Sequence, residues 1–173
     1  MRIKIISIIM LLSFPVCSQE IRERIIDVQN IYFMVYSGDR YKEIFRTPEN
    51  SSIYGYGLIT NDKAVFAYQD PERAAAIAIL DVIDIDSGKK IHSARIVDAG
   101  ETSFDFSIDA EKGVFNDSEG LSTVQLGESG LIIKPIAEIK EAYPYAPFWI
   151  DAQTIGYSFF ADDKQTFGLV NIQ

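Results

Sequence analysis

Acidic side chains are the commonest groups in this sequence that could do chemistry. Hydrolysis of a glycosidic bond needs two carboxyl groups that converge across a cleft. The sequence offers five candidates in or beside expected turns: Asp105, Asp109, Asp117, Asp162 and Asp163. Their spacing singles out no pair, and the chain holds 25 Asp and Glu residues, so carboxylates in turns are expected anyway. A carboxylate-dependent hydrolase is therefore only the second alternative function.

Nucleophilic and metal chemistry have even less support. The single histidine, His92, lies on an expected outer strand, and no Gly-x-Ser-x-Gly motif occurs. One His and one Cys are too few for the usual zinc ligand sets. The acidic run from Asp81 to Asp86 precedes Gly88 without the order of an EF-hand loop, and we expect Asp86 to accept backbone N–H groups in a turn. The sequence predicts a non-enzyme without metal or cofactor.

Aromatic side chains gather between residues 143 and 149, in a segment with two prolines. Tyr and Trp carry much of the binding energy of interfaces. We expect Phe148 and Trp149 to begin a core strand, which makes Tyr143 and Tyr145 the better contact residues. An acidic hairpin tip is expected before Lys164. The candidate partner-binding residues are Tyr143, Tyr145, Trp149, Asp162 and Asp163.

Residues 1–18 have the layout of a secretory signal peptide, with Arg2 and Lys4 before an apolar run and small residues before Gln19. We expect residues 19–173 to form the mature protein as a single all-β domain. The apolar run is too short to span a bilayer. The only cysteine, Cys17, would be removed, and the residues before it match a lipid-anchor signal poorly. The predicted location is the periplasm or the extracellular space, with a lipid anchor at Cys17 less favoured.

The mature chain is expected to be strongly acidic. Removing Arg2 and Lys4 leaves 14 basic against 25 acidic residues, a net charge of −11. Such a charge repels nucleic acid and anionic lipid. This negative charge either keeps the protein soluble or attracts a basic protein partner.

The remaining chain is typical of a β protein, with β-branched and aromatic runs between Gly, Asn, Asp and Pro. Only residues 20–29 have helical spacing, which predicts a short helix or a turn there. Thirteen strands are expected, at residues 31–36, 41–46, 53–60, 64–68, 75–85, 91–97, 104–108, 113–116, 121–126, 131–136, 148–150, 154–160 and 167–172.

Three segments share one order of elements. Each begins with an apolar strand, which is followed by a turn at Asp or Asn, a strand with Phe or Tyr, and a further strand. The middle strands VFAY, VFND and IGYS begin at Val65, Val114 and Ile155, 49 and 41 residues apart. This period is typical of propeller blades. With the turn residues of FSID and KGVF (106–109 and 112–115), the segments resemble blades of WD40-like β-propellers of the TolB and YVTN type. The resemblance covers residues 53–172 and implies a small or incomplete propeller-like array of four-stranded antiparallel units.

Three blades do not close a ring. The expected strands at 31–36 and 41–46 could pair with the last three strands and so complete a fourth unit. If they do not, a second copy of the chain could close the array. Gly55, Gly57 and Gly156 are interpreted as glycines where inner strands crowd. The alternatives are an up-and-down β-barrel similar to lipocalins, which would enclose an apolar ligand, and a sandwich.

The function that fits these observations is an exported, non-enzymatic, acidic module that binds a protein, with inhibition of an envelope-acting enzyme or toxin as a special case. The first alternative is a barrel that carries a small apolar ligand.

Overall fold

The computed structural model describes residues 21–25, 31–37, 40–72, 77–97, 103–117, 120–136, 145–161 and 164–172. Within these ranges the chain consists of strands, turns and short connections, without a helix. The strands are β1 (Ile21–Ile25), β2 (Ile31–Ser37), β3 (Arg40–Arg46), β4 (Ile53–Thr60), β5 (Lys63–Gln69), β6 (Ile77–Asp84), β7 (Lys89–Val97), β8 (Phe104–Ser107), β9 (Lys112–Asp117), β10 (Gly120–Gly127), β11 (Gly130–Pro135), β12 (Tyr145–Trp149), β13 (Thr154–Ala161) and β14 (Lys164–Asn171).

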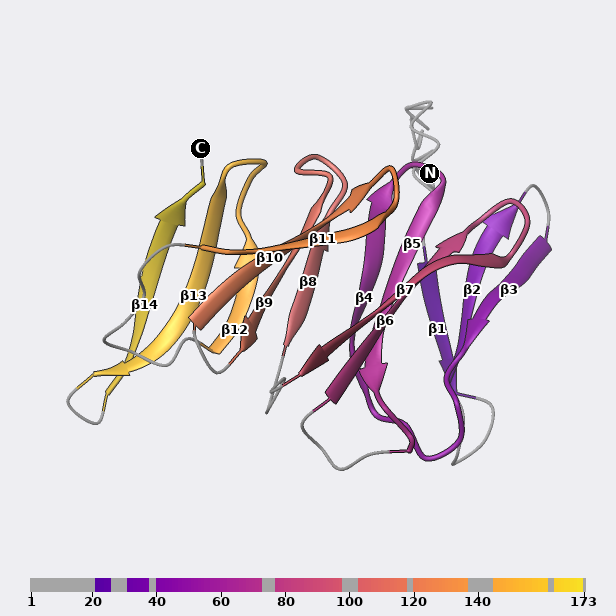
Figure 1. The fold of residues 1–173 in the computed structure, drawn as a ribbon, viewed down its shortest axis with the longest axis horizontal. Coiled ribbons are helices and arrows are strands. Elements are labelled where there is room, and N and C mark those ends of the chain that lie inside the picture. Colours follow the sequence, from indigo (N-terminus) through magenta and orange to yellow (C-terminus); the bar gives the residue numbers. More distant parts are fainter. Residues whose placement is uncertain are drawn as a thin grey trace, which may run out of the picture.

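The strands form four antiparallel sheets in chain order. The first sheet has the order β1-β2-β3, the second β4-β5-β6-β7, the third β8-β9-β10-β11 read from β8, and the fourth β12-β13-β14. Figure 1 shows them side by side in a row, with the first and fourth sheets at opposite ends. The described strands are therefore an open array of small sheets, and none of these sheets closes into a barrel.

All thirteen predicted strands are present, with ends that differ by a few residues. A short helix or turn is predicted at 20–29, and the structure describes residues 21–25 of this segment. For these residues the prediction is wrong, because Ile21–Ile25 is a strand that pairs with β2 from Ile21 opposite Val35 to Ile25 opposite Ile31. A helix of about ten residues is marginal without strong packing, whereas a neighbouring strand satisfies the backbone groups of Ile21–Ile25.

The repeated plan is visible in the sheets. The three predicted middle strands are β5, β9 and β13, and each is the second strand of its own sheet. The expected pairing of residues 31–36 and 41–46 with the last strands is not found. Instead β2 pairs with β3 on one side and with β1 on the other, in a separate sheet, so the fourth sheet keeps three strands in the described chain.

Three apolar clusters hold neighbouring sheets together. Phe33 of β2 and Phe66 of β5 join the first sheet to the second, with ring centroids 4.7 Å apart. Leu80 and Phe115 belong to the cluster between the second and third sheets. Ile155 joins a cluster of the third and fourth sheets. Burial of such side chains contributes about 1.5 to 3 kcal/mol each.

Glycines in β4 let the second and third sheets approach closely. A Cβ at Gly55 would lie 2.7 Å from the Cβ of Phe104, and a Cβ at Gly57 would lie 2.8 Å from the Cβ of Phe106. The predicted crowding at Gly55 and Gly57 is therefore confirmed. At Gly156 the crowding comes from the ring of Phe148, on the neighbouring strand of the same sheet.

Candidate functional site

The fourth sheet has two faces that differ in their surroundings. Side chains of directly paired residues lie on the same face of an antiparallel sheet. Phe148 pairs with Gly156, which in turn pairs with Leu169, and Ser158 pairs with Phe167. We call this side the outer face, defined by Phe148, Gly156, Ser158, Phe160, Phe167 and Leu169. The inner face carries Trp149, Ile155, Tyr157 and Val170.

The inner face packs on the third sheet. Ile155 is fully buried beside Val114 and Leu121, and Trp149 and Val170 pack around these three residues. A hydrogen bond strengthens this junction, because the backbone N–H of Trp149 donates to Oδ2 of Asp105 over 2.8 Å. The inner face is therefore a structural interface within the chain.

The outer face is apolar and exposed. The exposed fractions are 43% for Phe148, 59% for Phe160, 72% for Phe167 and 69% for Leu169. The ring of Phe148 lies over Gly156, where an added Cβ would be 2.5 Å from Cζ. The residues that define this face carry no charge, although the chain has a net charge of −9. A concentration of exposed large apolar side chains marks an interaction surface.

Among the strands that the structure describes, β14 is an edge strand of the fourth sheet, beside this face. It pairs with β13 over eight consecutive residue pairs without a register shift. After Lys164 it contains no charged residue and no proline, the usual devices that protect an edge strand. The second and third sheets have a fourth strand at the corresponding place, β7 and β11.

The predicted partner-binding residues belong to the strands of the fourth sheet or to the segments next to these strands in the sequence. Tyr143, Asp162 and Asp163 lie outside the described residues. Tyr145 begins β12, and Trp149 ends it on the inner face, where its indole Nε1 is buried without a hydrogen-bond partner among the described residues. The contact role of these residues stays a prediction. The sequence argument did not select the outer-face residues Phe160, Phe167 and Leu169.

Strand β12 is irregular, which decides where its aromatic side chains point. Its pairing with β13 shifts register between Tyr145 and Phe148, and Ala146 has a positive φ of 42°. Pro147 lies within this shift, at a sheet edge, where its missing N–H costs least. After the shift Phe148 lies on the outer face and Trp149 on the inner one. The expectation that both begin a core strand is therefore wrong for Phe148.

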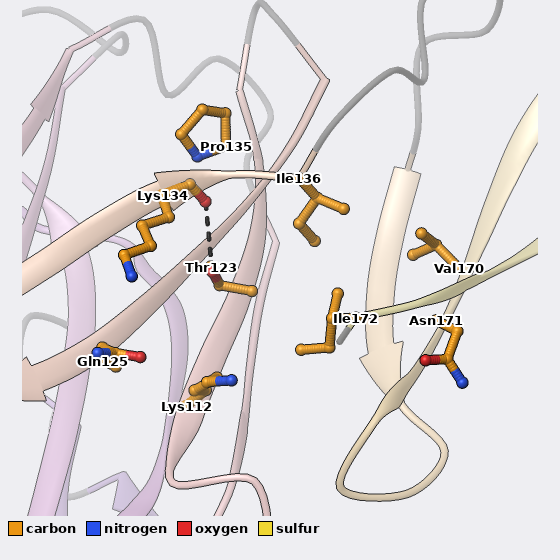
Figure 2. A pocket seen from close by; sticks show the side chains of 9 residues that line it. All are labelled: Lys112, Thr123, Gln125, Lys134, Pro135, Ile136, Val170, Asn171 and Ile172. Carbon is orange, nitrogen blue, oxygen red and sulfur yellow. Dashed lines mark hydrogen bonds between the residues drawn. The ribbon is translucent and has the colours of Figure 1, made fainter.

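A cavity of about 370 Å³ lies between the third and fourth sheets, shown in Figure 2. Thr123 donates a hydrogen bond there to the carbonyl of Lys134 over 3.3 Å. One wall is polar and the other is apolar, with Ile136 and Ile172 facing each other. The lining residues are Lys112, Thr123, Gln125, Lys134, Pro135, Ile136, Val170, Asn171 and Ile172. The two lysines could hold an anionic group at this position.

A second cavity, of about 450 Å³, borders β3 and the second sheet, and a buried carboxylate lies in its wall. Asp81 is 3% exposed and accepts hydrogen bonds from Tyr68 over 2.9 Å, from Ser93 over 2.7 Å and from Lys90 over 3.1 Å. Burial, followed by the negative charge of Asp81, raises the pKa of Tyr68 well above its usual range. This network ties β5, β6 and β7 together.

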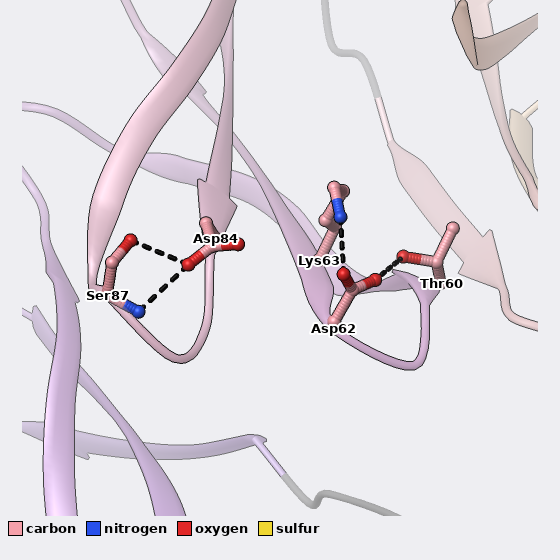
Figure 3. A network of polar contacts seen from close by, with 5 residues as sticks. All are labelled: Thr60, Asp62, Lys63, Asp84 and Ser87. Atoms are coloured by element: carbon pink, nitrogen blue, oxygen red, sulfur yellow. Dashed lines mark hydrogen bonds and ion pairs between the residues drawn. The ribbon is translucent and has the colours of Figure 1, made fainter.

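Carboxylates of the turns in the second sheet are used by the chain itself (Figure 3). The side chain and then the backbone N–H of Ser87 lower the pKa of Asp84 by hydrogen bonding. Lys63 and then Thr60 lower the pKa of Asp62. The acceptor in the turn before Gly88 is thus Asp84, and the expectation that Asp86 plays this part is wrong. Among the described residues no three acidic or His side chains are grouped to hold a metal ion.

Three other acidic candidates lie in the described chain, and one of them, Asp109, is exposed in the turn between β8 and β9. Asp105 accepts the backbone N–H groups of Trp149 and Phe106, and Asp117 accepts the hydroxyl of Ser122 over 2.8 Å. His92 lies half-buried on β7, the outer strand of the second sheet, as predicted. The described residues include no helix long and apolar enough to cross a membrane.

No family model and no curated protein matches the sequence. Solved structures match its fold. One, from a study of two prolyl endopeptidases, aligns with a TM-score of 0.58 at 11% identity, over 87% of this chain and 24% of that chain. Another, the 1.18 Å crystal structure of an uncharacterized protein from Listeria monocytogenes EGD-e, aligns with a TM-score of 0.51 at 14% identity, over 90% of this chain and 47% of that chain. The chain thus spans about a quarter and about half of their lengths, and at these identities the likeness concerns the fold alone.

Proposed function

We propose that this chain is a protein-binding module with no reaction of its own, and that it binds through the outer face of its fourth sheet. The observation that carries the proposal is the exposure of Phe148, Phe160, Phe167 and Leu169 on one face of a sheet whose other face is packed. Exposed apolar surface of this extent is costly in water unless another surface covers it.

The chemistry of the acidic residues supports the same proposal. Asp81 accepts a hydrogen bond from Tyr68 on the neighbouring strand β5, Asp84 accepts one from Ser87 in its own turn, and Asp105 accepts one from Trp149 of the fourth sheet. Their carboxylates stabilise the sheets and are not directed together at a cleft. The predicted leader at residues 1–18 supports a place of action in the periplasm or outside the cell.

Photo-crosslinking in the host cell tests the proposal. The photoreactive analogue p-benzoylphenylalanine replaces Phe167 in one variant and Val97 in a control, since Val97 is 64% exposed at the end of β7 in the second sheet. We expect a discrete protein adduct from position 167 and none of the same mass from position 97. No adduct from position 167, or equal adducts from both positions, would contradict the proposal.

A further inference from the structure

We infer that the partner bound by the outer face is a second copy of this chain, and that the two outer faces pack against each other around a twofold axis. This inference rests on the proposed function and names its partner. A twofold contact uses the same patch on both copies, so an apolar face meets an apolar face without any further complementarity.

The exposed area is sufficient for a weak dimer. With about 200 Å² for a fully exposed large side chain, the exposed fractions of Phe148, Phe160, Phe167 and Leu169 leave roughly 500 Å² of apolar surface per copy. Two such faces together bury roughly 1,000 Å², which is the lower limit for a specific interface. Buried area alone does not set an affinity, so the test below covers a wide range of protein concentrations.

The charge distribution favours a second copy over a basic partner. The chain has 25 acidic and 16 basic residues, so two copies repel each other at long range. By the same pairing the outer face also includes the uncharged polar residues Thr154, Gln165 and Asn171, and none of the residues placed on it carries a charge. A basic partner would be held by acidic residues at the contact, whereas an uncharged contact tolerates a second acidic chain once the faces meet.

The geometry also fits packing of one sheet on another. Phe167 and Leu169 are two positions apart on β14, so their side chains lie on the same face of the sheet. Ser158 and Gly156 are their paired residues on β13. Gly156 lies under the ring of Phe148 and Ser158 is buried, so the face that a second sheet would meet consists mainly of the large side chains, at the usual sheet spacing of about 10 Å. Lys164 is the first residue of β14, at the rim of the face.

Sedimentation velocity of the chain, purified as its own host processes it, tests the inference between about 1 and about 200 µM. We expect a monomer–dimer equilibrium that is unchanged or strengthened when NaCl rises from about 0.05 to about 0.5 M, because salt screens the repulsion between acidic copies. Phe167→Ser and Leu169→Ser should each weaken the dimer at least about tenfold. Val97→Ser is the matched control and should change nothing.

A second measurement does not depend on the folding of a variant. In the unmodified chain the methyl resonances of Leu169 should shift with protein concentration, while those of Val97 should not. A monomer at all concentrations overturns the second copy as partner; if position 167 still crosslinks to a different protein, the proposed function stands. A dimer that the Phe167 and Leu169 variants leave unchanged also overturns the inference, and a monomer without any adduct from position 167 overturns both proposals.

Discussion

Phe104 of β8 lies directly against the backbone of Gly55 in β4, so that an added Cβ at position 55 would be 2.7 Å from the Cβ of Phe104. The backbone of Phe104 is as close, and it cannot rotate away. The ring of Phe148 over Gly156 offers a matched comparison, because only the tip of a half-exposed ring obstructs a Cβ there.

Gly55→Ala is therefore expected to destabilise the fold by about 2 to 3 kcal/mol, since the second and third sheets must separate. Gly156→Ala should lower the free energy of unfolding by less than about 1 kcal/mol. Phe148 can turn outward, and the alanine reduces the conformational entropy of the unfolded chain, which offsets part of the loss. Urea unfolding monitored by circular dichroism measures both values. Equal losses would mean that the β4–β8 contact is not as tight as described.

Asp81 and Tyr68 should be energetically coupled. Asp81→Ala leaves the hydroxyl of Tyr68, a residue only 4% exposed, without its acceptor and should cost about 2 to 4 kcal/mol. Tyr68→Phe should cost less, about 1 to 2 kcal/mol. A double-mutant cycle measured by urea unfolding should give a coupling of at least about 1 kcal/mol, and additive losses would contradict the hydrogen bond.

Asp105 should hold the fourth sheet to the third. Asp105→Ala removes the acceptor of the Trp149 N–H and is expected to cost about 1 to 3 kcal/mol. Amide hydrogen exchange at Trp149 should become faster, while exchange at Val82 in the second sheet should not. Asp105→Asn keeps an acceptor oxygen and should restore part of the loss. Unchanged exchange at Trp149 would exclude this role.

Ser87 should control the acid titration of Asp84. Because the folded-state pKa of Asp84 is lowered, its contribution to stability is present above the ordinary pKa of about 4 and is lost as the pH falls through the folded-state value. Ser87→Ala should raise the pKa of Asp84 toward the ordinary value and move acid unfolding to slightly higher pH. Carboxyl NMR titration measures this change, and Asp151, whose pKa is lowered by the N–H of Gln153, is the internal control. An unchanged Asp84 titration would contradict the contact.

The strands were predictable because turn residues mark their ends. Gly88, which has a φ of 68°, marks the β6–β7 turn in the sequence, although the acceptor in this turn is Asp84 and not the predicted Asp86. The strand at Ile21–Ile25 was not predictable from its own residues. Its helical spacing of isoleucines is overridden by β2, a partner that local sequence does not identify.

The candidate site was predictable only in part. The aromatic segment at 143–149 does lead into the fourth sheet, but the register shift before Phe148 decides which ring faces outward. The exposure of Phe167 and Leu169 depends on whether another layer follows the fourth sheet. The alternation of side chains assigns each residue of a strand to one of two faces, but it does not show which face packs against another layer.

The arrangement of the four sheets in a row has a consequence for how the molecule opens. Because the core clusters join each sheet to the next one along the row, the array resembles a one-dimensional chain of cooperative units. The end units have one neighbour each and fray first, whereas β5, β6 and β9 lie within the two central sheets, which have neighbours on both sides. Subglobal opening should therefore begin at β12–β14 or β1–β3 and leave the central pair as the most persistent foldon.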